Sequence, residues 1–103
     1  MSWTNVKSKY INIVGTSSVQ VVPTPNRLRA LWIHADSSGT MTCYDASAAN
    51  GNASTMIIAL PNAQGGTDAT QSLLLPSAGI RHETALFVTV STSGTARITF
   101  FYD

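Results

Sequence analysis

The chain has 103 residues, of which 44% are hydrophobic and 11% are charged, and its formal net charge at pH 7 is +1. This length predicts a single domain, and the apolar content together with the low net charge excludes an intrinsically disordered chain. A charge this small provides no basic stripe for nucleic acid and no attraction to an anionic membrane, so we expect neither as a partner.

The chain begins with a polar segment. Residues 1–9 contain one large apolar side chain, Trp3, among Ser, Thr, Asn and Lys, which predicts an extended N-terminal arm in front of a domain over residues 10–103. No part of the sequence has an apolar stretch long enough for a signal peptide or a membrane span. We therefore expect the protein to be made and folded in a cytosol.

From residue 10 onwards, short runs of β-branched and aromatic residues alternate with clusters of Gly, Pro, Ser and Asn. No segment has the apolar spacing of an amphipathic helix. Each run predicts a strand, and the eight runs cover residues 10–14, 19–22, 28–35, 40–44, 55–60, 71–75, 85–90 and 96–102. Eight strands without a helix predict an all-β domain, a two-layer antiparallel β-sandwich of jelly-roll-like type.

Two stretches of the chain share a local sequence: residues 30–42 read ALWIHADSSGTMT, and residues 85–97 read ALFVTVSTSGTAR. Each contains a three-residue loop that ends in glycine, where a hairpin loop needs a left-handed residue. The repeat therefore predicts two β-hairpins. Their registers place Ile33 opposite Cys43 and Val88 opposite Ile98, which sets apolar residues against apolar residues.

The first stretch also contains the residue types of a catalytic triad, namely Cys43, His34 and Asp36. Side chains alternate along a strand, so Cys43 is predicted on the core face and the other two on the opposite face. We expect an inert, buried thiol, and a single cysteine also excludes an intrachain disulfide and a thiolate zinc cluster. His82 and Glu83 likewise point to opposite faces, and we expect His82 at solvent or at an interface. The sequence predicts no enzyme activity, no cofactor and no metal site.

Large aromatic side chains remain as the candidate site. Trp32, His34 and Tyr44 are predicted to share the outward face of the first hairpin, and Phe87 takes the equivalent position in the second. An aromatic side chain buries ~150–250 Å², worth several kcal/mol at ~25 cal/mol per Å², so either the same chain or another subunit should cover these rings. The candidate interface residues are Trp3, Trp32, His34, Tyr44, His82 and Phe87.

Several motifs within residues 28–103 form a recognisable pattern. They are GTMTCYDAS (39–47), LPSAGIR (75–81), LFVTV (86–90), GTA (94–96) and FFY (100–102). This pattern resembles that of small β-sandwich virion proteins of tailed bacteriophages. The resemblance implies a structural role without catalytic residues: some such proteins are capsid decoration (cement) proteins, often trimers seated on the shell, and others are tail or fibre components.

We therefore expect a non-enzymatic virion protein that assembles in the host cytoplasm. Its expected role is that of a capsid decoration protein, which stabilises the head by bridging coat subunits. The expected partners are the major capsid protein or other virion subunits, and further copies of the same chain, with a homotrimer favoured. The arm over residues 1–9 is expected on a neighbouring subunit with Trp3 as its anchor, or folded back over the Trp32 face of its own domain.

A second hypothesis from a different functional class stays open. The outward aromatics Trp32, Tyr44 and Phe87 could stack on sugar rings, with Asp36 and Thr42 as polar partners. The protein would then be a carbohydrate-binding module, alone or on a tail fibre.

Overall fold

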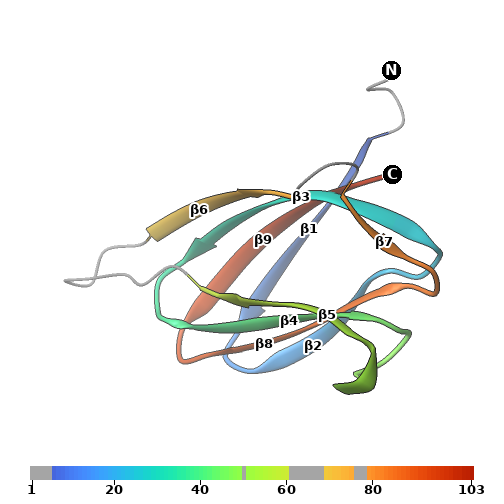
Figure 1. Cartoon of the computed structure of the whole chain (residues 1–103). Helices are drawn as coiled ribbons and strands as arrows, with labels where there is room; N and C mark the ends of the chain where they lie inside the picture. Colours follow the sequence, from blue (N-terminus) through green and yellow to red (C-terminus); the bar gives the residue numbers. More distant parts are fainter. Residues whose placement is uncertain (1–5, 50, 61–68, 76–78) are drawn as a thin grey trace.

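The computed structural model describes residues 6–49, 51–60, 69–75 and 79–103 (Figure 1). Within these residues the fold is all-β, as predicted from the sequence. The elements are β1 (Lys7–Val14), β2 (Ser17–Val22), β3 (Asn26–Ala35), β4 (Gly39–Asp45), the 3-10 turn η2 (Gly51–Ala53), β5 (Ser54–Ala59), β6 (Ala69–Leu74), β7 (Ile80–His82), β8 (Leu86–Thr92) and β9 (Thr95–Tyr102).

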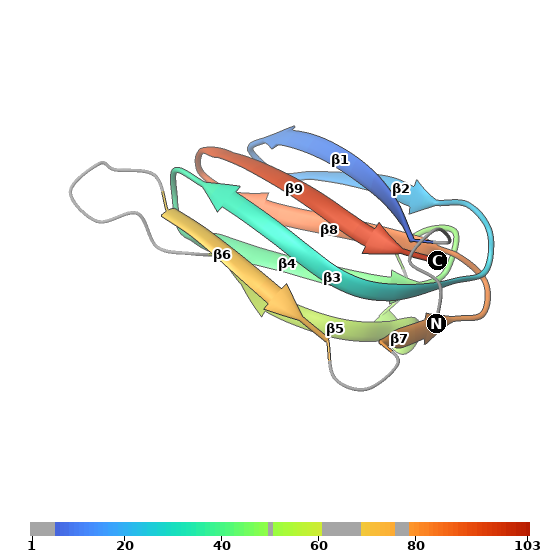
Figure 2. The ribbon, with the colours of Figure 1, turned by 90° about the horizontal axis from the view of Figure 1, so that it is seen from above.

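The strands form two antiparallel sheets that stack as a sandwich. Sheet A has the order β1-β9-β3-β6, with the short strand β7 also paired to β3, and sheet B has the order β2-β8-β4-β5. Figure 1 shows the two layers from the side, and Figure 2 looks down onto sheet A. The predicted two-layer antiparallel sandwich is confirmed.

The pairing order is that of a jelly roll. The chain folds as one long antiparallel hairpin, in which β1 pairs with β9, β2 with β8, β3 with β6 and β4 with β5. The hairpin then rolls up, so that β9 also pairs with β3 and β8 with β4. Neighbouring strands of the rolled sheet therefore come from distant parts of the sequence.

The two predicted hairpins do not form. β3 and β4 lie in different sheets, as do β8 and β9, so each shared loop is a corner between the sheets. The two copies pair with each other instead: Ile33 of β3 lies opposite Ile98 of β9, and Cys43 of β4 lies opposite Val88 of β8. Both arrangements set apolar residues against apolar residues, so side-chain alternation alone could not distinguish them.

The two corners require glycine for a reason other than the left-handed conformation that was predicted. Neither Gly39 nor Gly94 has a positive φ. A Cβ on Gly39 would collide with the backbone oxygen of Ser91, and a Cβ on Gly94 would collide with the Asp36 carboxylate. Glycine is needed here because the corners pack closely against each other.

Hydrogen bonds connect the two corners in both directions. The Asp36 carboxylate accepts a hydrogen bond from the backbone N–H of Thr95 at 2.6 Å. In return, the Thr92 hydroxyl of the second copy donates to the backbone oxygen of Ser38 in the first, at 3.1 Å. The repeated sequence therefore builds one interlocked end of the sandwich.

The core lies between the sheets and is made by alternate residues of each strand. Ile33, Met41 and Cys43 are fully buried, as their predicted inward positions require. Burial raises the pKa of the Cys43 thiol to about 12, because a thiolate would lose its hydration there. At neutral pH the thiol is therefore protonated and packs as a small apolar side chain.

One strand begins earlier than predicted, and one additional strand forms. β1 begins at Lys7, inside the range expected as an arm, and its residues 7–9 pair with Tyr102, Phe101 and Phe100 of β9. β7, which no apolar run indicated, pairs with the start of β3. Gly79 precedes β7 with a φ of 87°, and a Cβ there would collide with the Leu28 backbone oxygen. Trp3 lies outside the described residues.

Candidate interaction surface

The predicted aromatic cluster is divided between two opposite faces. Trp32 and His34 lie on β3 in sheet A, whereas Tyr44 and Phe87 lie on β4 and β8 in sheet B. Trp32 and His34 stack with ring centroids 6.0 Å apart, and Tyr44 and Phe87 form a tilted pair at 6.2 Å. The predicted common face is wrong, because it depended on β3 and β4 forming a hairpin.

Two neighbouring rows on the outer face of sheet A are rich in apolar side chains. Cross-strand registers place Tyr10, Thr99, Trp32 and Ser72 in one row across β1, β9, β3 and β6. The next row holds Ser8, Phe101, Ala30 and Leu74. Val14 lies on the same side at the end of β1, beyond a polar row that contains Asn12 and Arg97. We call this surface the apolar face; its apolar members are Tyr10, Val14, Ala30, Trp32, Leu74 and Phe101.

Exposure distinguishes this face from the rest of the described surface. Tyr10 is 53% exposed, Trp32 41%, Val14 74% and Leu74 84%. Only one other large hydrophobic side chain among the described residues is comparably exposed, Ile57 of β5 at 71%. Scattered exposed apolar residues are ordinary, but several on one sheet face indicate a surface for contact with another molecule.

A shallow groove of about 460 Å³ crosses the apolar face between β6, β3 and β9. Its polar side-chain groups are the hydroxyls of Ser72 and Thr99 and the indole N–H of Trp32, and none of its lining residues is charged or titratable. Its lining residues are Ala30, Leu31, Trp32, Ser72, Leu73, Leu74, Thr99 and Phe101. Such a groove can bury apolar side chains, and it offers two hydroxyls for orientation.

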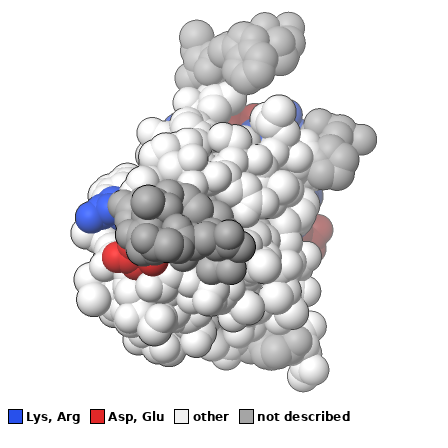
Figure 3. Space-filling model, turned by 90° about the vertical axis from the view of Figure 1, so that its left-hand side faces the viewer, with Lys and Arg blue, Asp and Glu red and all other residues white. Residues whose placement is uncertain are grey.

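The outer face of sheet B has a different character. Cross-strand registers align hydroxyl residues, so that Thr89 lies between Ser18 and Thr42, and Ser91 lies opposite Thr40. The Ser18 and Thr89 hydroxyls are hydrogen-bonded at 3.0 Å. We call this surface the hydroxyl face. Charged atoms are also sparse at the end of the sandwich seen in Figure 3.

The expectation that His82 lies at solvent or at an interface is wrong. Its side chain is 0% exposed, and its Nε2 lies 3.2 Å from the Thr55 hydroxyl. That hydroxyl donates its only hydrogen to the Cys43 backbone oxygen, so His82 Nε2 must be the donor to Thr55. Burial lowers the pKa of His82, although the Asp45 charge and the Ile80 backbone oppose the change. His82 is a structural link between β7 and β5.

Asp45 has a structural role next to this histidine. Its carboxylate accepts hydrogen bonds from the backbone N–H groups of Glu83 and Thr84, at 3.1 and 2.9 Å. Desolvation alone would raise the pKa of Asp45, but these donors, with Ala85 and the charge of His82, lower it overall. The carboxylate therefore stabilises the turn that leads into β8.

The described residues contain no candidate metal-binding cluster. No group of three or more His, Cys, Asp and Glu side chains in them could hold a metal ion. The same part of the chain contains no helix long and apolar enough to cross a membrane. Cys43 is buried in the core on β4 of sheet B, whereas His34 lies at an outward position of β3 in sheet A, so the two are apart, but not on opposite faces of one hairpin as predicted.

The apolar face includes residues that the sequence did not single out. Tyr10, Leu74 and Phe101 were predicted in strands, and alternation could have indicated their outward direction. Their proximity to Trp32 depends on the order β1-β9-β3-β6, which local patterns do not carry.

Two comparisons with known proteins found no match. No protein-family model matches the chain, and no curated protein matches it significantly. The likeness to virion proteins therefore rests on the sequence motifs alone.

Proposed function

We propose that this protein is a non-enzymatic structural component of a bacteriophage particle, a capsid decoration protein that bridges coat subunits through its apolar face. The observation that carries the proposal is the concentration of exposed Tyr10, Val14, Trp32 and Leu74 on one side of a closed sandwich. The virion motifs described above supply the biological setting. Jelly rolls occur in viral capsid proteins, which agrees with the proposal but does not establish it.

The physical basis is the gain from covering this face. Aromatic rings bury ~150–250 Å² each, so docking two of them removes enough apolar surface to contribute several kcal/mol before the costs of association. A shell presents many equivalent docking positions. Contacts that are individually modest can therefore sum to strong retention through multivalency, most of all if the protein is a homotrimer.

A matched pair of variants tests the role of the face. Leu74 and Ile57 are both aliphatic, highly exposed and located on edge strands, but they lie on opposite sheets. Purified L74S protein should bind less to particles that lack the native protein, while I57S should bind as the native protein does. Sedimentation of particles with quantified bound protein measures this. Absence of the native protein from purified particles by mass spectrometry would reject the proposal.

Carbohydrate binding is the second candidate function. The exposed Trp32 beside the hydroxyls of Ser72 and Thr99 favours it, since sugar sites combine aromatic platforms with hydroxyl partners. The sugar site expected from the sequence cannot form, because Trp32 lies in sheet A and its expected partners Tyr44 and Phe87 lie in sheet B. Saturable quenching of tryptophan fluorescence by a host polysaccharide, abolished in L74S, would favour this function.

The N-terminal arm has a narrower role in the proposal than the sequence suggested. Residues 7–9 pair with β9 of the same chain, so the part free to reach a neighbour ends before Lys7. Deleting residues 1–5 should leave the sandwich folded and weaken particle binding or trimer formation. A drop in the thermal stability of the truncated protein, with binding unchanged, would instead favour an arm that covers its own domain.

A further inference from the structure

The charged residues of this sandwich are divided unevenly between its two sheets. All four arginines of the chain lie on strands of sheet A, namely Arg27 and Arg29 on β3, Arg81 on β7 and Arg97 on β9. The four strands of sheet B contain a single charged residue, Asp45, whose carboxylate stabilises the turn into β8. The sheet that carries the apolar face is therefore also the sheet that carries the arginines.

Strand alternation directs three of these arginines to the outer face. Arg97 lies between the buried residues Ala96 and Ile98 on β9. On β3, Arg27 likewise has a buried residue on each side, and its cross-strand partner is Arg81 of β7. Neighbouring residues of a strand point to opposite faces, so Arg27, Arg81 and Arg97 point to the outer face of sheet A.

These three arginines lie beyond the two ends of the apolar groove. Arg97 is in the row next to that of Trp32, opposite His34 of β3. Arg27 lies near the start of β3, before Ala30, which belongs to the other apolar row. The stretch of β3 between His34 and Arg27 corresponds to about 20 Å at ~3.3 Å per residue. The groove falls within this interval, because Ala30 and Trp32 both line it.

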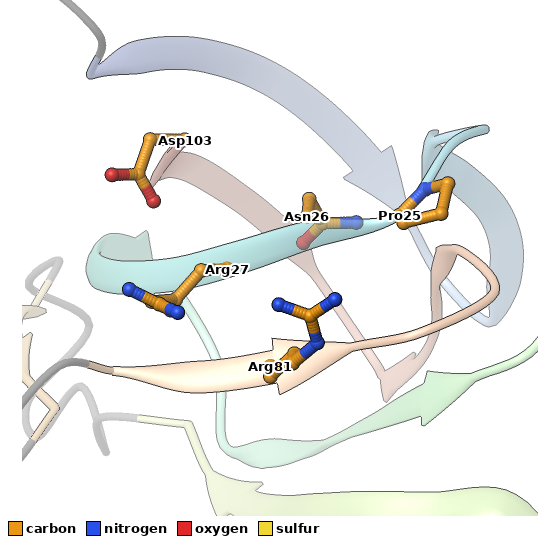
Figure 4. Close-up of a pocket in the computed structure, with 5 residues that line it drawn as sticks. All are labelled: Pro25, Asn26, Arg27, Arg81 and Asp103. Atoms are coloured by element: carbon orange, nitrogen blue, oxygen red, sulfur yellow. The ribbon is translucent and has the colours of Figure 1, made fainter.

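Arg27 and Arg81 form the cationic site at one end. With Asp103 they line a shallow pocket of about 270 Å³ (Figure 4). Asp103 is already engaged by Arg29, whose Nη2 and Nε donate to its carboxylate oxygens at 2.7 and 3.2 Å. Glu83 approaches Arg81 only to 4.0 Å, and both side chains are largely exposed, so this pair contributes little. A carboxylate from another molecule would therefore find free donors here, and it would reduce the repulsion between the two cross-strand arginines.

Arg97 is the cationic site at the other end. It is exposed, and it forms no ion pair with another described residue. The corner beside it contains Asp36, whose carboxylate already accepts a hydrogen bond from the backbone N–H of Thr95 at 2.6 Å. The cross-strand partners of Arg97 are Asn12 and His34, which bring no negative charge. A molecule that covers the apolar face would meet this guanidinium group without a direct counter-ion.

The carboxylates of the chain argue against a second copy as the molecule that covers this face. Asp36, Asp45 and Asp103 accept hydrogen bonds within their own chain. Among the described residues, this leaves Glu83 as the one carboxylate that accepts no hydrogen bond. Packing sheet A of one copy on sheet A of another would bring arginines together with too few free carboxylates to pair them. Juxtaposed like charges oppose association.

Given docking at the apolar face as proposed above, we propose that its occupant is a segment of a different protein in which apolar side chains are flanked by two carboxylates. The apolar side chains lie in the groove, one carboxylate binds Arg97, and the other binds between Arg27 and Arg81. An extended segment rises ~3.3 Å per residue, so the two acidic residues are about six residues apart. Aromatic residues at the centre and arginines around them are typical of residues that dominate interface energy.

The test measures binding of the purified protein to particles that lack the native protein, by sedimentation at about 50 mM and about 500 mM NaCl. R97Q and the double variant R27Q/R81Q should each bind about tenfold more weakly at the lower salt concentration, and their binding should depend less on salt than that of the native protein. K9Q is the control. It removes the same formal charge from β1, where Lys9 pairs with the buried Phe100 and so points away from the apolar face, and it should bind as the native protein does. All variants should melt within a few degrees of the native protein, since the changed side chains lie at the surface.

The outcomes separate this inference from the proposed function. If L74S weakens binding while R97Q and R27Q/R81Q bind as the native protein does, the apolar face docks but its partner lacks the flanking carboxylates, and the inference is wrong. If none of these variants weakens binding, docking at this face is itself rejected. Loss of native binding after nuclease treatment of the particles would assign the arginines to nucleic acid. Self-association of the free protein that L74S abolishes would assign the face to a second copy. Either of these results would overturn the inference.

Discussion

The two outer faces of the sandwich differ although their strands follow the same alternation. On sheet A the outward positions include Tyr10, Trp32 and Leu74, and on sheet B they include the hydroxyl pair of Thr42 and Thr89 beside the aromatic pair of Tyr44 and Phe87. A hydroxyl is satisfied by water or by a neighbouring hydroxyl, so the hydroxyl residues need no partner, and Ile57 is the one large hydrophobic side chain of that sheet that is highly exposed among the described residues. An exposed tryptophan or leucine gains free energy when it is covered. The difference teaches that sheet A gathers several exposed apolar side chains on one surface, which suits it to contact, whereas sheet B exposes mainly hydroxyls at its centre.

The largest effect on stability is expected at the corners, the two loops that connect sheet A with sheet B. A Cβ at position 39 would collide with the backbone oxygen of Ser91, which a side-chain rotation cannot relieve. G39A should therefore lower the free energy of unfolding by about 2–4 kcal/mol. Urea denaturation measures this value, with S93A in the other of the two corners as the control. A change below about 0.5 kcal/mol in G39A would show that the corners do not require close contact.

The second effect is a loss of docking affinity at the apolar face. W32S should weaken docking at the apolar face by about tenfold or more, which corresponds to about 1.4 kcal/mol, because exposed aromatics dominate the energy of interfaces. T42V on the hydroxyl face is the control and should leave affinity unchanged. Retention on a hydrophobic-interaction column gives a measurement that needs no partner, and W32S should elute earlier than the native protein. Equal retention of W32S and the native protein would mean that Trp32 does not make the apolar face more hydrophobic than the hydroxyl face.

A third test uses pH to examine His82, which is buried between the two sheets. Burial lowers the pKa of His82 from its ordinary 6.5, so the unfolded chain binds a proton at a higher pH than the folded one. The free energy of unfolding should therefore decrease as pH falls below about 6.5, in the window between the two pKa values. Denaturant unfolding at pH 7 and pH 5 measures this decrease.

The matched variants for this test are H82Q and H34Q. H82Q keeps an N–H donor for Thr55 but cannot titrate, so it should show a smaller decrease between pH 7 and pH 5. H34Q alters the outer face of sheet A and should retain the native pH dependence. A decrease in H82Q as large as that in the native protein would show that the burial of His82 is not its cause.

The smallest effect is expected on the hydroxyl face itself. T89V removes the exposed hydrogen bond to Ser18 but keeps the β-branched shape that suits a strand. Its free energy of unfolding should change by less than about 0.5 kcal/mol, and its particle binding should not change. Weaker particle binding by T89V would mean that both faces dock, and the contrast between them would then lose its functional meaning.

Much of the architecture was predictable from local pattern. All eight predicted strands form, because β-branched and aromatic runs between turn residues specify extended structure without reference to the rest of the chain. Alternation also predicted which side chains point inward, and Cys43 and Ile33 are buried as expected. β7 was missed because a three-residue strand depends on pairing with β3 and carries no pattern of its own.

The sequence by itself determined the all-β class, the positions of the eight predicted strands and the inward direction of side chains such as Ile33 and Cys43, because these depend on neighbouring residues. Only the tertiary structure decided which strands pair, and therefore that Trp32 joins Tyr10 and Leu74 while Tyr44 joins Phe87 on the opposite sheet. The physical reason is that backbone hydrogen bonds can form between any two extended segments. Pairing is selected by the closure of the whole core and by close contacts such as those at Gly39 and Gly94, which no local pattern records.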